Sequence, residues 1–163
     1  MKKITVLALV LSLVPSVIFA EGALPPSASK VDVNIYINKT LQNVPDKMGK
    51  AYIDSKTNRT MVPVRFISEA LGATVNFIPE LENQKAGFLI GTRGKIIRMN
   101  IDENEASVME KDAEKKVVLD SAAILYDGRS YVPVRFLSEA LGFKVEYTDG
   151  NVYIEGKRVD ESK

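Results

Sequence analysis

The sequence contains no cysteine and no histidine. Without cysteine there is no disulfide framework, so the fold must be held together by its core alone. Without either residue the chain has no Ser-His-Asp or Cys-His nucleophile system and no histidine or thiolate ligand for zinc, copper or iron. These absences favour a protein that is not an enzyme, and we predict no catalytic residue, no metal site and no cofactor.

The sequence also lacks an excess of charge of one sign. Its 163 residues include 22 lysines and arginines and 21 aspartates and glutamates, which gives a formal net charge of +1. Removal of the first twenty residues, which hold Lys2 and Lys3 and no acid, changes this charge to −1. A near-neutral chain offers no electrostatic footprint for nucleic acid or anionic lipid. We therefore expect no nucleic-acid partner.

One hydrophobic run is present, but it is short. The N-terminus, MKKITVLALVLSLVPSVIFA, has two lysines, then apolar residues 4–14, then a small residue at Ala20, which is the pattern of a secretory signal peptide. The run is shorter than the about 20 apolar residues that a transmembrane helix needs. We predict a signal peptide over residues 1–20, a mature chain that begins near Glu21 without a membrane span, and a protein that is secreted or cell wall-associated.

A twelve-residue block occurs twice, seventy residues apart. MVPVRFISEALG spans residues 61–72 and YVPVRFLSEALG spans residues 131–142, with only two positions different. Each block predicts a short helix, with Pro63 or Pro133 at its first position and a left-handed glycine at its end. A helix of two to three turns is not stable alone in water, so packing must hold it in place.

Alternating apolar and polar residues flank both blocks and predict strands. A hairpin precedes each block, with turns at residues 54–58 and at Asp127-Gly128, and a charged turn is expected at residues 110–114. The expected strands cover residues 31–37, 52–53, 59–62, 73–77, 86–90, 95–101, 106–109, 116–119, 123–126, 129–132, 143–147 and 151–155.

The order strand pair, short helix, strand pair therefore occurs twice. We predict an α+β fold, a single pseudo-two-fold domain of two β-hairpin/short helix/β-strand repeats, about residues 31–90 and 95–156. A mostly antiparallel sheet is expected to pack on the two short helices. The Pro/Ser-rich residues 21–30 predict a flexible linker, and residues 157–163 predict a polar tail.

The repeated pattern resembles a known family. The pattern spans residues 59–77 and again residues 129–147. It begins with arginine, then threonine or serine, then a hydrophobic residue. V-P-V-R-F, another hydrophobic residue and S-E-A-L-G follow, and an alternating strand that ends in an aromatic residue completes it. This resembles the copper amine oxidase N-terminal-like domain of exported proteins of Gram-positive bacteria, over residues 31–156. Members of the family commonly have tryptophan where this chain has Phe77 and Tyr147, so we expect an aromatic core residue at both positions.

The resemblance implies an accessory module, not an oxidase. The family takes its name from a non-catalytic domain of an amine oxidase, whose copper and quinone chemistry lies in a separate large domain that this sequence does not contain. The resemblance therefore implies an exported or cell-surface module that has no oxidase chemistry of its own.

Four charged residues of the repeated blocks are candidate site residues: Arg65, Glu69, Arg135 and Glu139. In each predicted helix the arginine stands near the N-terminus and the glutamate near the C-terminus, against the macrodipole. A solvated i,i+4 pair would contribute only about 0.3 kcal/mol. Because the unfavourable placement occurs twice, we predict tertiary partners that tie each helix to the sheet. The alternative is that the two arginines converge across the pseudo-axis to bind an anion or an acidic sugar.

Two other motifs are interpreted as turns. GFLIGTRGK, residues 87–95, fits neither glycine pattern of a phosphate-binding loop and joins two strands instead of leading into a helix. DENE, residues 102–105, lacks the central glycine and the closing glutamate of an EF-hand loop, which leaves weak surface calcium binding as a minor alternative.

Together these features predict a non-catalytic exported binding or spacer module at the cell envelope. Its partner would be an unknown cell-wall or envelope component, or an exported protein. The alternatives are a cell-wall glycan hydrolase that uses a carboxylate pair and a regulator of another exported protein that pairs through an exposed strand edge.

Overall fold

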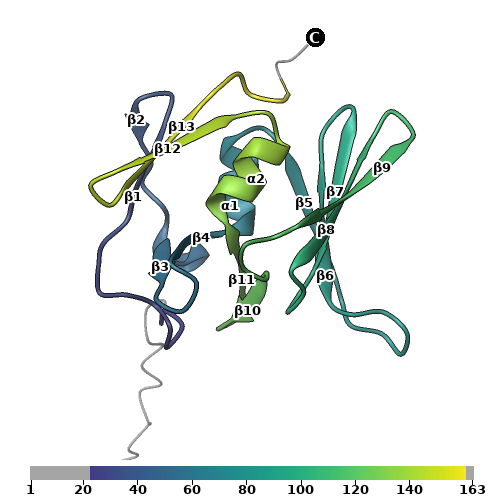
Figure 1. Ribbon diagram of the computed structural model, residues 1–163, viewed down its shortest axis with the longest axis horizontal. Coiled ribbons are helices and arrows are strands. Elements are labelled where there is room, and N and C mark those ends of the chain that lie inside the picture. The colour runs from purple at the N-terminus through teal and green to yellow at the C-terminus, as the bar shows by residue number, and fades with distance from the viewer. Residues whose placement is uncertain (1–22, 161–163) are drawn as a thin grey trace, which may run out of the picture.

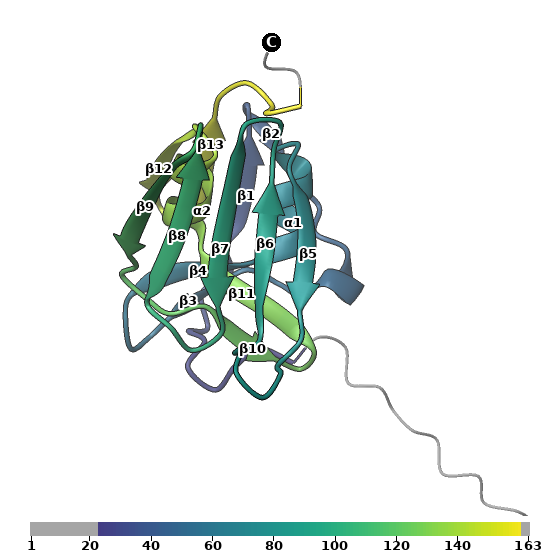
Figure 2. The same ribbon diagram turned by 90° about the vertical axis from the view of Figure 1, so that its right-hand side faces the viewer.

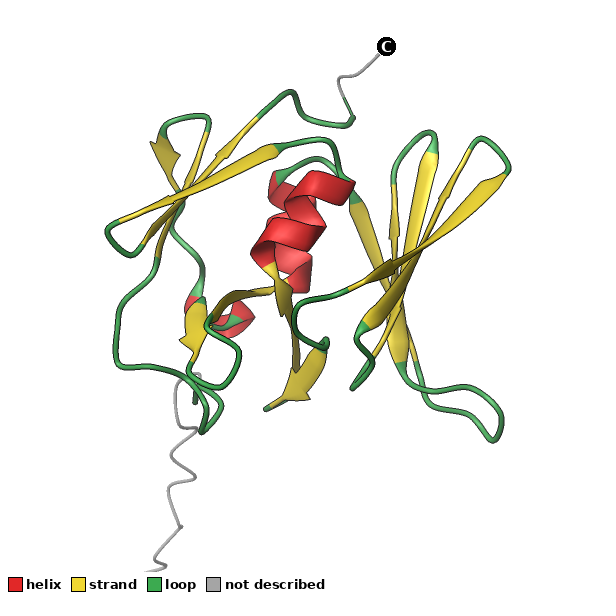
Figure 3. Ribbon diagram, in the orientation of Figure 1, coloured by secondary structure: helices red, strands yellow, loops and turns green. Residues whose placement is uncertain are grey.

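The computed structural model describes residues 23–160, so the predicted signal peptide and the last three residues of the predicted tail lie outside the described residues. Between residues 23 and 160 there are two short α-helices and three sheets, which confirms the predicted α+β class. Figures 1 and 3 show the helices in the middle, with one sheet on each side of them and the third below.

The helices are α1 (Val64–Ala70) and α2 (Val134–Ala140), and a single 3₁₀ turn, η1, covers Asp46–Met48. Both helices begin one residue later than predicted. Pro63 and Pro133 end the preceding strands with extended ψ angles of 120° and 121°, so each proline is the N-cap residue of its helix. The fixed φ of proline suits both the end of a strand and the entry into a helix.

Glycine ends both helices, as predicted. Gly72 and Gly142 have φ angles of 90° and 91°. The amide N–H of Gly72 donates to the carbonyl of Glu69 at 3.0 Å, and that of Ala73 donates to the carbonyl of Ser68 at 2.8 Å. This is the Schellman pattern, and the second helix repeats it.

The sheet below the helices joins the two repeats. Its strand order is β10-β11-β4-β3. The strands β4 and β11 are antiparallel, and Val62 lies opposite Val132 at the centre of their register. Equivalent strands of the two repeats therefore meet at the pseudo-two-fold axis. The bounds are β3 (Tyr52–Asp54), β4 (Arg59–Pro63), β10 (Ile124–Tyr126) and β11 (Arg129–Pro133).

The other two sheets lie on opposite sides of the helices, so the strands form three sheets instead of one. One has the order β12-β13-β1-β2, in which β1 is parallel to β13. The other, β5-β6-β7-β8-β9, is an antiparallel meander that faces the viewer in Figure 2. The bounds are β1 (Asn34–Ile37), β2 (Thr40–Leu41), β5 (Thr74–Ile78), β6 (Gly87–Gly91), β7 (Lys95–Asn100), β8 (Glu105–Glu110), β9 (Ala113–Val118), β12 (Lys144–Thr148) and β13 (Asn151–Glu155).

The main hydrophobic core lies between these layers. The helix residues Ile67 and Leu137 are fully buried, and they pack in the same cluster as Ile97 of β7 and Ile154 of β13. Complete burial of one aliphatic side chain contributes about 1.5–3 kcal/mol. Packing of this kind holds helices that are too short to be stable by themselves.

Two local expectations differ from the structure, and a third agrees with it. The first strand begins at Asn34, not at residue 31. The charged turn consists of Lys111 and Asp112 alone, with φ angles of 48° and 64°, because a two-residue turn lets β8 and β9 pair further than predicted. The Asp127-Gly128 turn is as predicted, with φ angles of 48° and 69°.

Segments expected to be a linker and a tail make specific contacts. The amide N–H of Ser29 donates to the carbonyl of Ile53 at 2.8 Å, and that of Ser55 donates to the carbonyl of Ser27 at 2.8 Å. Near the other end, the amide N–H of Val159 donates to the carbonyl of Leu71 at 3.0 Å. Both segments therefore pack on the domain within the described residues.

Candidate functional site

The four charged residues of the repeated blocks lie at the surface. Arg65, Glu69, Arg135 and Glu139 are exposed, and between residues 23 and 160 none of them forms an ion pair. The expected polar ties from the arginines to loop carbonyls or carboxylates are not found among these residues. The i,i+4 spacing therefore does not produce a salt bridge in either helix.

Arg135 does have a partner on the sheet, and that partner is aromatic. Its guanidinium carbon lies 4.8 Å from the centroid of the Tyr147 ring, on β12. A cation over an aromatic face contributes about 0.5–1 kcal/mol at an exposed site. Burial raises the pKa of the Tyr147 hydroxyl, and the nearby positive charge of Arg135 opposes that effect.

The negative ends of both helices are capped by cations from elsewhere in the chain. Lys95 Nζ, at the start of β7, donates to the carbonyl of Ala140 at 2.8 Å. Arg158 Nη1, after β13, donates to the carbonyl of Ala70 at 2.9 Å. Lys95 follows β6 and Arg158 follows β13. Lys95 caps the helix of the second repeat, and Arg158, beyond the second repeat, caps the helix of the first. The helix dipole and the glutamates Glu69 and Glu139 both place negative charge near the C-terminal ends of the helices, and these cations offset that charge.

Two grooves lie beside the helices, and each is built from both repeats. The Arg65 groove is lined by Arg65 and Phe77 of the first repeat and by Leu125, Arg129 and Ser130 of the second. It has a volume of about 750 Å³. The hairpin β10-β11 forms one wall, and β5 forms the other.

The Arg135 groove is the pseudo-symmetric counterpart, with a volume of about 360 Å³. It is lined by Arg135 and Tyr147 of the second repeat and by Ile53, Arg59 and Thr60 of the first. These five residues occupy the positions of the five in the Arg65 groove. The two arginines therefore line separate grooves and do not converge on one site.

Exposed apolar side chains and cations distinguish the Arg65 groove. Phe77 and Leu125 are 48% and 47% exposed, although both are large hydrophobic residues. Lys47 of η1 joins Arg65 and Arg129 at the groove, and no aspartate or glutamate lines it in the part of the chain that the structure describes. Arg129 is paired with Asp127 at 2.5 Å. In the described residues, Lys47 and Arg65 have no such counterion.

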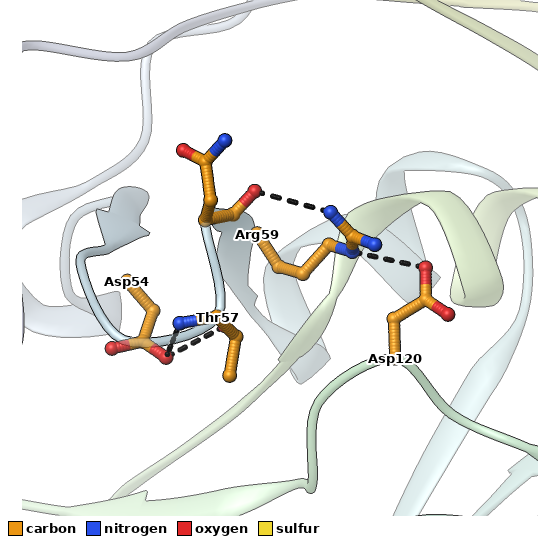
Figure 4. A network of polar contacts seen from close by, with 5 residues as sticks. Asp54, Thr57, Arg59 and Asp120 are labelled. Atoms are coloured by element: carbon orange, nitrogen blue, oxygen red, sulfur yellow. Dashed lines mark hydrogen bonds and ion pairs between the residues drawn. The ribbon is translucent and has the colours of Figure 1, made fainter.

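The Arg135 groove is occupied by its own side chains. Arg59 Nε donates to Asp120 Oδ2 at 2.9 Å, and Arg135 lies over Tyr147. Figure 4 shows the Arg59–Asp120 pair beside the β3-β4 hairpin. These internal contacts satisfy both arginines, so the second groove offers fewer free groups to a ligand than the first.

The β3-β4 hairpin that supports this wall is fixed by Asp54. Its carboxylate accepts from the hydroxyl of Thr57 at 2.7 Å and from the amide N–H of the same residue at 3.3 Å (Figure 4). Burial acts to raise the pKa of Asp54, but hydrogen bonds from Thr57, Ser27 and Lys56 outweigh it and hold the pKa below its usual value. The ionised form therefore stabilises the turn.

The two motifs interpreted as turns have that structure. Residues 92–94 join β6 to β7, and Thr92 Oγ1 accepts from the amide N–H of Lys95 at 3.1 Å. In the acidic motif, Glu103 accepts from Lys85 Nζ at 2.7 Å and Glu105 from Lys116 Nζ at 2.9 Å. Over residues 23–160 no group of three His, Cys, Asp or Glu could hold a metal ion.

The sequence interpretation placed Phe77 and Tyr147 in the core, and this was wrong. Tyr147 is 38% exposed, and both residues line grooves. Both side chains are therefore at the surface, at the walls of the two grooves. The interpretation also missed Lys47, Leu125 and the capping cations. A cation a few residues after the last strand of each repeat was the one available signal for the caps.

Comparison with known proteins gives one match. The model of the family described as "Copper amine oxidase N-terminal domain" matches residues 33–155. No curated protein and no solved structure matches the chain.

Proposed function

The chain belongs to the copper amine oxidase N-terminal domain family, an accessory module, and from this premise we propose that it is a non-catalytic binding module exported to the cell envelope. Export rests on the signal-peptide pattern of residues 1–20. No helix within residues 23–160 is long and apolar enough to cross a membrane.

The observation that carries the proposal is the Arg65 groove. It combines exposed Phe77 and Leu125 with the cations Lys47 and Arg65, which have no counterion among the described residues. Ligand sites are typically concave and mostly apolar, with a few placed polar groups. A pure spacer would need no such surface, so the groove favours binding over spacing.

The hydrolase alternative has less support. Glycoside hydrolysis needs two carboxylates on either side of the bond that breaks. Among the residues that line the two grooves there is one carboxylate, Asp120, and it is paired with Arg59. Regulation of another exported protein remains a form of the same binding function, with a protein as the ligand.

Co-sedimentation of the mature chain with isolated cell envelopes tests the proposal. We expect saturable retention that Arg65→Gln lowers several-fold and Arg135→Gln, the same substitution in the other repeat, leaves nearly unchanged. The same incubation is assayed for soluble wall fragments. Release of fragments would establish a hydrolase, and absence of retention would refute the binding function.

A further inference from the structure

We propose that the Arg65 groove binds an extended peptide segment that carries acidic and apolar side chains, and that the segment adds to the sheet along the free edge of β5. This inference rests on the proposed binding function and names its partner class. Three independent features of the groove lead to it.

The first feature is the apolar surface. Phe77 projects from β5 and Leu125 from β10, and both are about half exposed while they face one groove. Buried Val64 and Phe88 form apolar lining between them. Adjacent exposed hydrophobic residues at a concave site mark a contact surface for apolar groups. A polar glycan would leave Leu125 unmatched, whereas an aliphatic or aromatic side chain of a peptide would cover it.

The second feature is charge. Lys47, Arg65 and Arg129 contribute three cations to the lining, and no acid lines the groove in the described part of the chain. Arg129 shares its charge with Asp127, so Lys47 and Arg65 carry most of the uncompensated charge. Electrostatic complementarity selects partners by sign, and arginine binds carboxylates with strong, directional hydrogen bonds. The complementary ligand is acidic.

The third feature is the free edge of β5. Within residues 23–160, β5 pairs in its sheet with β6 alone, and Figure 2 shows it as one outer strand of that sheet, with β9 as the other. Edge strands are usually protected by charged side chains. The strand β5, TVNFI, has none, whereas β9, AEKKVV, and the equivalent strand β12, KVEYT, each carry lysine and glutamate.

An uncharged edge beside a cationic, apolar groove matches the mode in which an extended peptide adds a strand to a sheet. Main-chain hydrogen bonds to β5 would supply affinity. Alternate side chains of the peptide would then face the groove, with apolar groups against Phe77 and Leu125 and carboxylates at Lys47 and Arg65.

Fluorescence anisotropy of the full chain with a labelled synthetic peptide tests this inference. The probe combines glutamate with valine and phenylalanine over the length of one strand, and its matched control has lysine in place of every glutamate. We expect saturable binding of the acidic probe and binding of the lysine probe that is weaker by at least about tenfold, since loss of a close charge pair at an interface costs that much or more.

Variants at equivalent positions of the two repeats locate the site. Arg65→Gln should weaken binding of the acidic probe about tenfold, and Arg135→Gln should change it by less than about twofold. Phe77→Ser should weaken it similarly, with Tyr147→Ser as its control. Each of the four positions is exposed, so the variants should fold, and circular dichroism checks this.

Several results would overturn the inference. Equal binding of both probes, or equal loss in Arg65→Gln and Arg135→Gln, would show that the groove does not select an acidic peptide. Retention on isolated envelopes that purified wall glycan competes away, without binding of the acidic probe, would refute the peptide and leave the binding function intact. Loss of both envelope retention and probe binding would refute both proposals.

Discussion

Replacement of Lys95 by methionine tests whether a cation from a distant strand stabilises the C-terminal end of α2. Lys95 Nζ donates to the carbonyl of Ala140, the last residue of α2, and it also lies 3.4 Å from Glu110 Oε2. Methionine keeps the unbranched stem and removes only the ammonium group. The substitution therefore deletes the cap with little change in packing.

The structure allows an estimate of the cost. A hydrogen bond to a charged group contributes about 1.5–3 kcal/mol, and a cation at a helix C-terminus contributes about 0.3–1 kcal/mol. The Lys95 side chain is 22% exposed, so the lower end of the first range applies. Glu110 is 54% exposed, and an ion pair with it adds little. We expect the free energy of unfolding to fall by about 1.5 kcal/mol.

Urea denaturation followed by circular dichroism measures this change, provided that unfolding is two-state. Lys116→Met is the matched control, because Lys116 also has a carboxylate partner, Glu105 at 2.9 Å, but is 70% exposed and caps no helix. The control should cost less than about 0.5 kcal/mol. Thermal melting should show a shift of about 5 °C for Lys95→Met, as expected for a domain of this size.

Two results would contradict a stabilising cap: equal stability of Lys95→Met and Lys116→Met, or unfolding of Lys95→Met at the wild-type urea concentration. Either result would mean that solvent satisfies the carbonyl of Ala140 as well as Lys95 does. The contact between Lys95 and Ala140 would then contribute nothing measurable to stability.

Three further predictions concern other positions. Ser68→Ala should leave the free energy of unfolding, measured by urea denaturation, unchanged or raise it by up to about 1 kcal/mol. The reason is that the buried Ser68 hydroxyl has no hydrogen-bond partner among the described residues. A clear loss of stability would show that the hydroxyl does have a partner. Gly142→Ala should lower the free energy of unfolding by about 1–2 kcal/mol, because alanine is strained at a positive φ. Gly72→Ala should lower it further, since a Cβ there would also meet Asp160. Equal losses in the two variants would contradict that contact. Because the pKa of Asp54 is lowered in the folded state, its stabilising effect is complete above about pH 4 and is lost as the pH falls through the folded-state pKa. Asp54→Asn should therefore flatten the dependence of the free energy of unfolding on pH in acid. An unchanged slope would contradict this prediction.

Local signals in the sequence predicted the local structure. Asp127-Gly128 specified its hairpin, and Gly72 and Gly142 specified both helix ends, because a left-handed backbone is accessible to very few residue types. The alternation of apolar and polar residues predicted most of the strands correctly. These features depend on neighbours within a few residues, which is the range over which a pattern is informative.

Contacts between distant segments could not be predicted in the same way. The alternation of apolar and polar residues does not indicate that β1 pairs with β13 in parallel. Nor does it indicate that the ammonium group of Lys95 contacts Ala140. The candidate site was the hardest part to predict, because each groove has one wall from each repeat. Arg65 was identified by its unfavourable position in α1, but its neighbours Leu125 and Lys47 carry no local signal that connects them to it.

The pairing of β1 with β13 also bears on the time course of folding. Strands that are separated by more than a hundred residues must meet before this sheet can form, and α1 receives its cap from Arg158, beyond the last strand. Contacts of such long range form slowly, because a large loop must close first. A nascent chain that lacks β13 cannot complete either structure. The complete fold can therefore form only after the segment that holds β13 and Arg158 has been synthesised.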